Sequence, residues 1–186
     1  MKVLKFGGTS VGSAQRMKEV AKLILDGEQK IVVLSAMSGT TNSLVEISDY
    51  LYKRNPDGAI DAINALEAKY YPVVEELLST AESKELGKTI VKERFDVLRS
   101  IASSTKPFTS FEEKVILAQG ELTSTALVNA YLVEQGVKSC LLPALDFMKT
   151  DKNAEPDMNY IRTNVKICDV SKGTYTDLNE CSAAVS

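Results

Sequence analysis

The pattern of apolar and polar positions divides the first forty residues into strand, helix and strand. Residues 2–6 form a short alternating apolar run, whereas residues 31–36 form a continuous apolar and β-branched run. These runs predict two strands, the second of them buried. Between them lies a predicted helix with Ser13 as its N-cap, Gly27 near its C-terminal end, and apolar residues at helical spacing, namely Met17, Val20, Ala21, Ile24 and Leu25. The order predicts a right-handed βαβ unit with parallel strands in an α/β domain.

The next hundred residues are predicted to be mostly helical. Two long runs of helical period fill residues 56–108 and indicate a helical insertion. Pro72 falls inside the first run and is expected to kink or divide it, because proline removes a backbone donor and clashes with the preceding turn. Residues 112–134 predict a further helix, and residues 137–142 predict a third strand.

Composition narrows the classes of function. The chain of 186 residues is 44% hydrophobic and 25% charged, which is typical of a folded globular protein. Its 22 basic and 25 acidic side chains give a net charge of −3, so it offers no overall basic field for a nucleic acid or an anionic membrane. It contains no histidine, which excludes Ser-His-Asp, Cys-His and His-zinc chemistry in this chain. Catalysis here would depend on lysine, carboxylates, hydroxyls and backbone amides.

The cysteines and the N-terminus predict a cytoplasmic location. Cys140, Cys168 and Cys181 are odd in number, far apart and without CxxC spacing, which argues against a disulfide framework or a zinc site. We therefore expect them to be ordinary small apolar residues in a reducing compartment. The apolar run at the N-terminus is too short for a signal peptide, and no apolar run in the chain approaches ~18 residues. Neither export nor a membrane span is therefore expected.

A lysine and two glycines follow the first strand. Lys5 is followed by Phe6, Gly7-Gly8, Thr9 and Ser10. Glycines allow a phosphate to approach the backbone, while amide groups, a helix N-terminus and the lysine supply positive charge, so the turn is a candidate anion site. It is not a Walker A motif, because there the lysine follows the glycines. The alternative is a tight strand-to-helix turn with a surface lysine.

A second turn of small polar residues follows the second strand. It runs from Ser35 through Gly39 to Thr41 and Asn42, where a helix is predicted to begin. Ligands of open α/β sheets bind outside the carboxyl ends of strands, so the two turns are expected to face one crevice. The alternative is that Thr41 or Asn42 merely caps the helix.

A glycine and a glutamate lie in the middle of the last predicted helix. Gly120 costs about 1 kcal/mol relative to alanine at such a position, so something should compensate. Glu121 shares its helix face with Leu117, Ser124 and Val128. A carboxylate on a half-apolar face is a candidate to receive an ammonium or hydroxyl group of a ligand. The alternative is a partly exposed charge next to a glycine that eases helix packing.

Together these motifs resemble the N-terminal part of bacterial aspartate kinases of the amino acid kinase superfamily. The resemblance covers roughly residues 2–157 and rests on motifs in the family's order: KFGGTSV at 5–11, VVLSAMSGTTN at 32–42, the helical insertion, QGE at 119–121 with Ser124 close behind, and AEPD at 154–157. It implies an α/β fold, a three-layer α/β/α sandwich of the amino acid kinase type, present in incomplete form with a helical insertion.

The resemblance also implies an activity. The family transfers the γ-phosphoryl group of ATP, with Mg²⁺, to the side-chain carboxylate of L-aspartate, giving 4-phospho-L-aspartate on the way to lysine, threonine and methionine. By this resemblance Lys5 is the catalytic residue that neutralises the ATP phosphates. The remaining roles fall on phosphate-binding Gly7, Gly8 and Ser10, and on aspartate-binding Ser35, Gly39, Thr41 and Glu121, whose carboxylate would hold the α-ammonium group.

The resemblance ends near Asp157. Residues 158–186 have no recognisable counterpart in the family, so we expect a truncated catalytic domain over residues 1–157 followed by a divergent tail, through a frameshift, a partial gene model or a fragment. Two alternatives stay open. One is a non-catalytic remnant that binds aspartate or a full-length subunit, and the other is a related kinase acting on glutamate or acetylglutamate. A homo-oligomer is a further option that the sequence leaves open.

Overall fold

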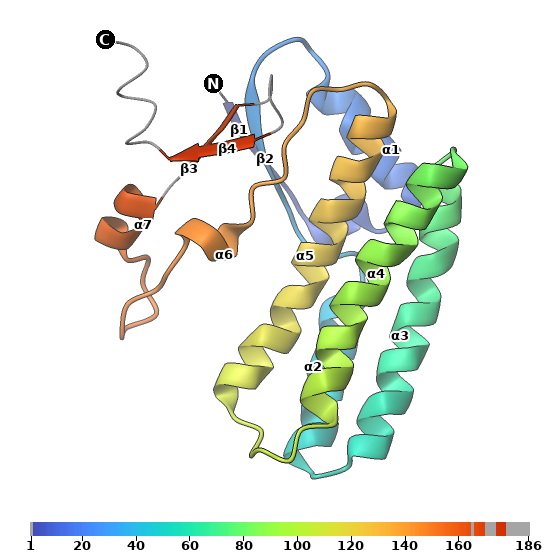
Figure 1. The fold of residues 1–186 in the computed structure, drawn as a ribbon, viewed down its shortest axis with the longest axis vertical. Coiled ribbons are helices and arrows are strands. Elements are labelled where there is room, and N and C mark those ends of the chain that lie inside the picture. The colour runs from blue at the N-terminus through green and yellow to red at the C-terminus, as the bar shows by residue number, and fades with distance from the viewer. Residues whose placement is uncertain (1, 165, 170–173, 178–186) are drawn as a thin grey trace. The chain divides into compact units, whose positions relative to one another are not determined.

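The computed structural model describes residues 2–164, 166–169 and 174–177, which Figure 1 shows as a ribbon. The chain forms two compact units, Met1–Gln135 and Gly136–Ser186, and each is described by itself. The first unit contains every residue proposed above for a binding or catalytic role.

The first unit begins with the predicted βαβ arrangement. Strand β1 spans Lys2–Phe6, helix α1 spans Ala14–Ile24, and strand β2 spans Lys30–Leu34. The two strands pair in parallel with Lys5 opposite Val33, which confirms the predicted crossover. A short 3₁₀ helix, Gly8–Val11, separates β1 from α1.

Helix α1 begins where the sequence predicts. The Ser13 hydroxyl accepts a hydrogen bond from the Arg16 backbone N–H at 3.3 Å, which satisfies one of the first amides of the helix. The predicted apolar positions from Met17 to Ile24 are buried. Leu25 is an exception, because the helix has already ended there and its side chain is 50% exposed. The chain then turns through Gly27 with a φ of 83°.

The prediction that the second strand is buried is wrong for one of its faces. Leu34 is buried on the face toward the helices, and α5 contacts β2. On the opposite face Ile31 and Val33 are 39% and 43% exposed, and Val3 of β1 is 65% exposed. A continuous apolar run suits a strand covered on both sides, but in this structure a helical layer covers one side.

Four helices form a bundle beside the strands. They are α2 (Thr40–Tyr52), α3 (Pro56–Leu77), α4 (Ala81–Ala102) and α5 (Ser110–Glu134). Each contacts the next, and α5 also contacts α2, so the four lie side by side around a shared core (Figure 1). The two helices predicted within residues 56–108 and the helix predicted over 112–134 are confirmed. The core includes fully buried Ile63, Tyr70, Val74, Leu77, Leu98, Ile116 and Leu127.

Pro72 does not divide α3, contrary to one of the predicted outcomes. The helix is continuous from Pro56 to Leu77. Pro72 and Ala68, the residue whose carbonyl loses its helical donor, are both exposed. Water can therefore satisfy that carbonyl, which reduces the cost of the proline.

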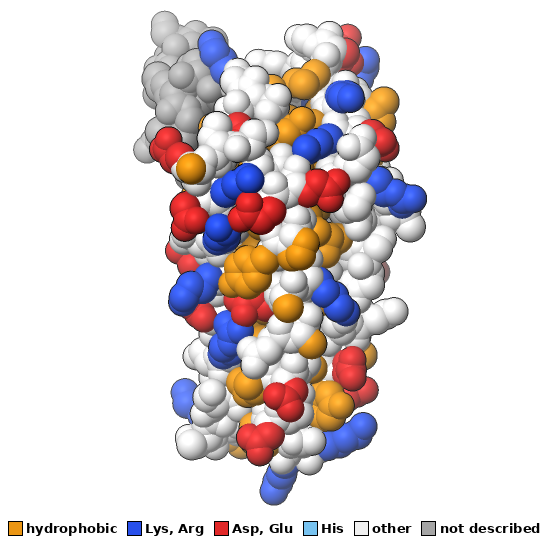
Figure 2. Space-filling view, turned by 90° about the vertical axis from the view of Figure 1, so that its right-hand side faces the viewer, with side chains coloured by type: hydrophobic (Ala, Val, Ile, Leu, Met, Phe, Trp, Pro, Cys, Tyr) orange, Lys and Arg blue, Asp and Glu red, His pale blue; other side chains and the backbone are white. Residues whose placement is uncertain are grey.

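Charged side chains cover the outer faces of α3 and α4. Figure 2, which views the molecule from the side of these helices, shows basic and acidic groups interspersed across this face. Glu75 pairs with Lys88 at 2.9 Å and with Lys84 at 3.0 Å. Hydrogen bonds from these two lysines hold the pKa of Glu75 below its usual value. Such mixed pairs are typical of a solvated helix surface.

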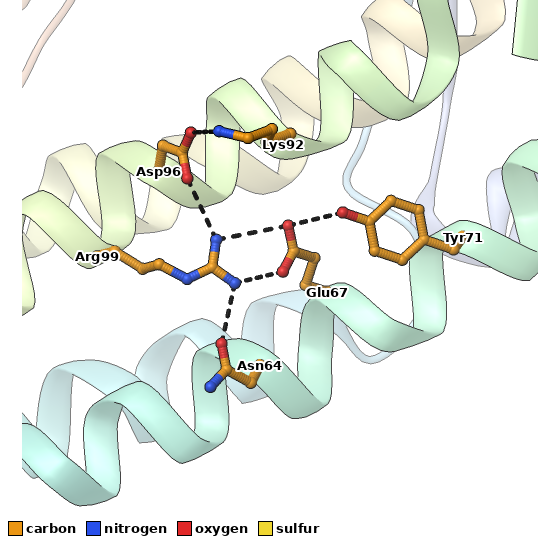
Figure 3. A network of polar contacts seen from close by, with 6 residues as sticks. All are labelled: Asn64, Glu67, Tyr71, Lys92, Asp96 and Arg99. Carbon is orange, nitrogen blue, oxygen red and sulfur yellow. Dashed lines mark hydrogen bonds and ion pairs between the residues drawn. The ribbon is translucent and has the colours of Figure 1, made fainter. Parts of the chain in front are cut away.

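A polar network also joins α3 to α4 (Figure 3). The Arg99 guanidinium forms an ion pair with Glu67, donates to the Asn64 side chain at 2.9 Å and pairs with Asp96 at 3.3 Å. The Tyr71 hydroxyl donates to Glu67 at 3.0 Å. The Glu67 side chain is only 12% exposed, so its charge depends on these partners.

The second unit contains two short helices and a hairpin. Helix α6 spans Ala144–Phe147, α7 spans Met158–Asn164, and β3 (Lys166–Asp169) pairs antiparallel with β4 (Thr174–Asp177). The strand predicted over residues 137–142 is wrong, because that stretch has no assigned secondary structure. An apolar run forms a strand only where a neighbouring strand supplies hydrogen bonds, and no such ladder forms in that stretch.

Two further details of this unit bear on the sequence expectations. The Asp157 carboxylate accepts a hydrogen bond from the Tyr160 backbone N–H at 2.9 Å, so it caps α7. Cys140 is disulfide-bonded, which contradicts the expectation of three ordinary thiols. Residues 178–186, with Cys181, lie outside the described part of the chain. Within the described part, no helix combines the length and apolar character that crossing a membrane demands.

Candidate active site

The turns after β1 and β2 lie in contact at the carboxyl ends of the two strands. The Ser38 hydroxyl donates to the Gly8 carbonyl at 3.0 Å. The Ser35 backbone N–H donates to the Phe6 carbonyl at 3.1 Å. Because the strands are parallel, both turns leave the sheet at the same end, where ligands of open α/β sheets bind.

Glycines make this close contact possible. A Cβ added at Gly8 would lie 2.9 Å from the Ala36 carbonyl oxygen, and one added at Gly12 would lie 2.6 Å from the Ser38 Oγ. At Gly7 an added Cβ would meet nothing within 4 Å. Gly8 and Gly12 therefore serve the packing of one turn on the other, whereas Gly7 presents open, exposed backbone.

The residues expected to bind phosphate differ in their surroundings. Lys5 is exposed on β1, and Ser10 is half-buried in the 3₁₀ helix. The Ser10 backbone N–H donates to the Gly7 carbonyl at 2.9 Å, so this amide is already engaged. Beside Ser10 is an open groove of about 390 Å³ lined by Phe6, Thr9, Ser10, Arg16, Glu19, Val20 and Leu23. The first α-helix does not follow the glycines directly, because the 3₁₀ helix comes between.

The second turn passes directly into α2. Gly39 is the N-cap and has a φ of 81°, a left-handed conformation that glycine adopts without strain. Thr41 and Asn42 lie inside the first turn of the helix. The suggestion that either of them caps the helix is therefore wrong, because the left-handed residue ends the turn before them. Thr41 and Gly39 are both exposed.

Helix α5 brings the third group of residues to the same place. The Ser124 hydroxyl donates to the Ser35 carbonyl at 2.7 Å. A Cβ added at Gly120 would lie 2.8 Å from the Ala36 Cβ and 3.1 Å from the Thr40 Cγ2. This close approach explains the glycine in mid-helix. Glu121 follows Gly120 and is exposed, so the turn with Ser35 and the segment with Glu121 lie next to each other.

Two buried side chains at this junction were not recognised as site residues from the sequence. Tyr70 Oη of α3 and Thr40 Oγ1 are 2.9 Å apart in a buried hydrogen bond. Burial raises the pKa of Tyr70, the hydrogen bond with Thr40 acts in the opposite direction, and the Glu121 charge raises it further. The available signal was a tyrosine in an apolar helical stripe, because a buried tyrosine hydroxyl requires a partner.

The described residues contain no group of three or more histidine, cysteine, aspartate or glutamate side chains arranged to hold a metal ion. The residues assigned to the site supply a lysine, exposed turn backbone, hydroxyls and the Glu121 carboxylate. This is a set suited to binding a polyanion and an ammonium group.

The sequence of the chain matches the amino acid kinase family over residues 1–175. The chain belongs to the amino acid kinase family. The match extends past residue 157, so it includes part of the segment that carries none of the motifs quoted above.

Aspartokinases are among the relatives of this chain. Aspartokinase 2, chloroplastic, of Arabidopsis thaliana is 34% identical over 164 residues, which are 84% of this chain and 29% of that protein. The lysine-sensitive aspartokinase 3 of Escherichia coli (strain K12) is 29% identical over 160 residues, 84% of this chain and 34% of that protein. The chain thus spans about a third of the length of these relatives.

Solved structures of E. coli aspartokinase III share the fold. The complex with aspartate and ADP has a TM-score of 0.70 and 27% identity, covering 88% of this chain and 36% of that one. The complex with lysine and aspartate has a TM-score of 0.69 and 26% identity, covering 87% and 36%. The short parallel sheet and the helices of this chain are therefore part of a known α/β fold, as the sequence predicts.

Proposed function

We propose that the chain carries the aspartate-binding and phosphate-binding parts of an aspartate kinase, which transfers the γ-phosphoryl group of ATP to the side-chain carboxylate of L-aspartate. The observation that carries the proposal is the meeting of three segments, the turn at Gly8, the turn from Ser35 to Gly39, and α5 at Gly120. The similarity to aspartokinases, including one solved with aspartate and ADP, supports a role for this junction in binding aspartate and the phosphates of ATP.

The phosphate side of the proposed reaction falls on the first turn. Lys5 would neutralise charge on the transferred phosphoryl group, while Gly7, Gly8 and Ser10 would lie against the phosphates. Gly7 is suited to this because its backbone is exposed and nothing occupies the space beside it. Gly8 and the Ser10 amide are engaged in the turn itself, so their contribution would be to shape it.

The aspartate side falls on the second turn and α5. Glu121 would bind the α-ammonium group, and Ser35, Gly39 and Thr41 would line the pocket. Exposed Gly39, Thr41 and Glu121 are accessible to a small molecule. Ser35 is half-buried and its carbonyl is held by Ser124, so it would define the pocket wall.

Magnesium in this proposal arrives with the nucleotide. Because the described residues provide no acidic cluster for it, the phosphate oxygens of ATP would be its main ligands. When bound, the ion would neutralise phosphate charge and so assist the transfer. The protein's own part is to hold Lys5 and the aspartate carboxylate in place.

This chemistry suits a chain without histidine. Phosphoryl transfer depends mostly on positioning and charge neutralisation, and a carboxylate nucleophile is already ionised at neutral pH. No general base is needed. The cytoplasmic location and a homo-oligomeric state stay predictions from the sequence.

The test is a hydroxamate assay on the purified chain. It is incubated with Mg-ATP and L-aspartate, the acyl phosphate is trapped with hydroxylamine, and Lys5→Ala and Glu121→Ala are run beside it. A signal that both substitutions abolish is the expected result. A signal with L-glutamate or acetylglutamate in place of L-aspartate would overturn the substrate assignment.

A binding measurement separates catalysis from binding alone. Absence of acyl phosphate together with an aspartate-dependent thermal shift, lost in Glu121→Ala and kept in Lys5→Ala, would replace the proposal with an aspartate-binding role. Absence of both signals would contradict the aspartate site altogether.

A further inference from the structure

Tyr70 of α3 lies where the helical bundle meets the turn between β2 and α2. Its hydroxyl shares a buried hydrogen bond of 2.9 Å with Thr40. Thr40 is the first residue of α2 and stands between Gly39 and Thr41, the two residues assigned above to the aspartate pocket. This hydrogen bond therefore links the helical insertion to the segment that would line the proposed substrate pocket.

Packing holds both partners of this hydrogen bond. The Tyr70 ring is fully buried and meets the Phe95 ring of α4 edge to face, with ring centroids 5.6 Å apart and an angle of 63°. The Thr40 methyl group lies close to Gly120, since a Cβ added there would be 3.1 Å from it. With the ring fixed by α4 and the methyl group fixed by α5, the hydroxyls have little freedom to move apart.

The space beside this contact is small. Tyr70, Thr40, Gln119 and Thr123 line a small void together with apolar side chains, and that void is too small to hold a water molecule. Removal of the Tyr70 hydroxyl would take from Thr40 Oγ1 the partner that it has in the structure. The first residue of α2 must then shift or leave a buried hydroxyl without a partner.

Tyr70 is also within electrostatic reach of Glu121. Burial raises the pKa of Tyr70 above its ordinary value, the hydrogen bond with Thr40 opposes this, and the Glu121 carboxylate raises it further. The hydroxyl therefore stays neutral at physiological pH. It is hydrogen-bonded to Thr40, in the segment that would line the substrate pocket, and it is influenced by the charge of the carboxylate that would bind the ammonium group.

We infer that Tyr70 is a positioning residue for the amino-acid substrate, fixing the segment from Gly39 to Thr41 relative to Glu121. Tyr70 would act through Thr40, and no contact with substrate is assigned to it. The inference rests on the proposed function, because it assigns a role within the proposed aspartate pocket. It gives the helical insertion a part in substrate affinity in addition to its part in the core.

The test compares neighbouring tyrosines. Tyr71 is the matched control, because its hydroxyl also makes a hydrogen bond, to Glu67 at 3.0 Å, within the contact between α3 and α4. L-aspartate is titrated by calorimetry into the full chain and its Tyr70→Phe and Tyr71→Phe variants. We expect the Kd to rise about three- to tenfold in Tyr70→Phe, as for the loss of one buried hydrogen bond, and to stay unchanged in Tyr71→Phe.

Two further measurements separate positioning from general destabilisation. Thr40→Val removes the other partner, so the double variant Tyr70→Phe/Thr40→Val should bind aspartate no more weakly than Thr40→Val alone. Without any ligand, the backbone amide NMR signals of Gly39 and Thr41 should shift in Tyr70→Phe and not in Tyr71→Phe, even if both variants unfold at a lower temperature.

The outcomes distinguish the inference from the proposed function. A wild-type chain that binds aspartate, with the same affinity in Tyr70→Phe, would overturn the role of Tyr70 and leave the function standing. Equal weakening in Tyr70→Phe and Tyr71→Phe would also overturn it, because the effect would then come from the bundle as a whole. A wild-type chain that does not bind aspartate would overturn the proposed function, and the role of Tyr70 with it.

Discussion

The helical bundle and the two-stranded sheet of the first unit bury their apolar residues to very different extents. In the bundle, Tyr70, Leu98 and Ile116 are 0% exposed. In the sheet, Val3 and Val33 are 65% and 43% exposed. Burial of apolar area is the main stabilising contribution to folding, so the bundle has its own core while the sheet depends on packing from one side.

The proposed site lies at the boundary between these two regions. Its turns directly follow the strands, but the contacts that hold these turns are made by the bundle, through Ser124 and Gly120 of α5 and Tyr70 of α3. Helices of the bundle therefore hold the turns of the proposed substrate pocket, and α2 and α5 also carry Thr41 and Glu121, two of the four residues assigned to it. Four measurements test this contrast.

The largest expected effect comes from shortening a core side chain. Leu98→Ala should lower the free energy of unfolding by about 2–5 kcal/mol, because a fully buried leucine leaves a cavity in the bundle. Val33→Ala in the sheet should cost less than about 1 kcal/mol, since its side chain is already partly in water. Urea denaturation followed by circular dichroism measures both, and equal losses would refute the contrast.

The polar network between α3 and α4 should give the next effect. Arg99→Met removes the cationic partner of Glu67, whose side chain is 12% exposed, and leaves the carboxylate with its hydrogen bond from Tyr71. We expect a loss of about 1–3 kcal/mol in the free energy of unfolding, the range for a lost hydrogen bond to a charged group. Lys92→Met is the control, because its partner Asp96 is more exposed and an exposed pair contributes little. A similar loss in the control would show that Arg99 acts only as surface charge.

A substitution at the boundary between the bundle and the sheet should lower the free energy of unfolding by a smaller amount. Gly120→Ala introduces a Cβ 2.8 Å from that of Ala36, which strains the packing by about 1–3 kcal/mol. Alanine's better helix propensity returns about 1 kcal/mol, so the net loss is about 0–2 kcal/mol. Gly7→Ala meets no neighbouring atom and should leave the free energy of unfolding unchanged. Aspartate titration should show weaker binding in Gly120→Ala, and unchanged affinity there would separate the pocket from α5.

The smallest expected effect is an acid sensitivity of the bundle. Burial opposes ionisation of Glu134, but hydrogen bonds from the Thr80 and Ser79 backbone N–H groups, both at 2.8 Å, leave its pKa below the ordinary value of 4.5. A lowered pKa in the folded state contributes stability that is present above about pH 4.5 and is lost as the pH falls through the folded value. Thermal unfolding from pH 3 to pH 7 should show this loss, and it should flatten in Glu134→Gln. An unchanged slope in that variant would assign the acid sensitivity to other carboxylates.

Local pattern was enough to predict much of the fold. The strands predicted at residues 2–6 and 31–36 are found at Lys2–Phe6 and Lys30–Leu34. They, the cap at Ser13 and the helices of the bundle depend on the period of apolar residues and on nearby polar groups, which the sequence displays directly. The prediction of a third strand at 137–142 is wrong because an apolar run does not show whether a neighbouring strand is available to pair with it.

The candidate site was predictable in its turns but not in its supports. Runs of glycine and hydroxyl residues after strands point to Gly7, Ser35 and Gly39 without knowledge of packing. The bond between Tyr70 and Thr40 joins residues 30 apart and depends on how α3 packs against α2, which no local pattern specifies. A glycine in mid-helix is anomalous on sequence alone, and the structure explains Gly120 by its close contact with Ala36.

The hydrogen bond from Ser124 to Ser35 joins residues 89 apart in the chain. Closing so long a loop is entropically costly, whereas neighbouring helices of the bundle are joined by short connections and can pair early. Loop-closure entropy therefore favours late formation of this contact during folding. On the ribosome, the turn at Ser35 must wait for about ninety further residues to be synthesised before its partner on α5 exists.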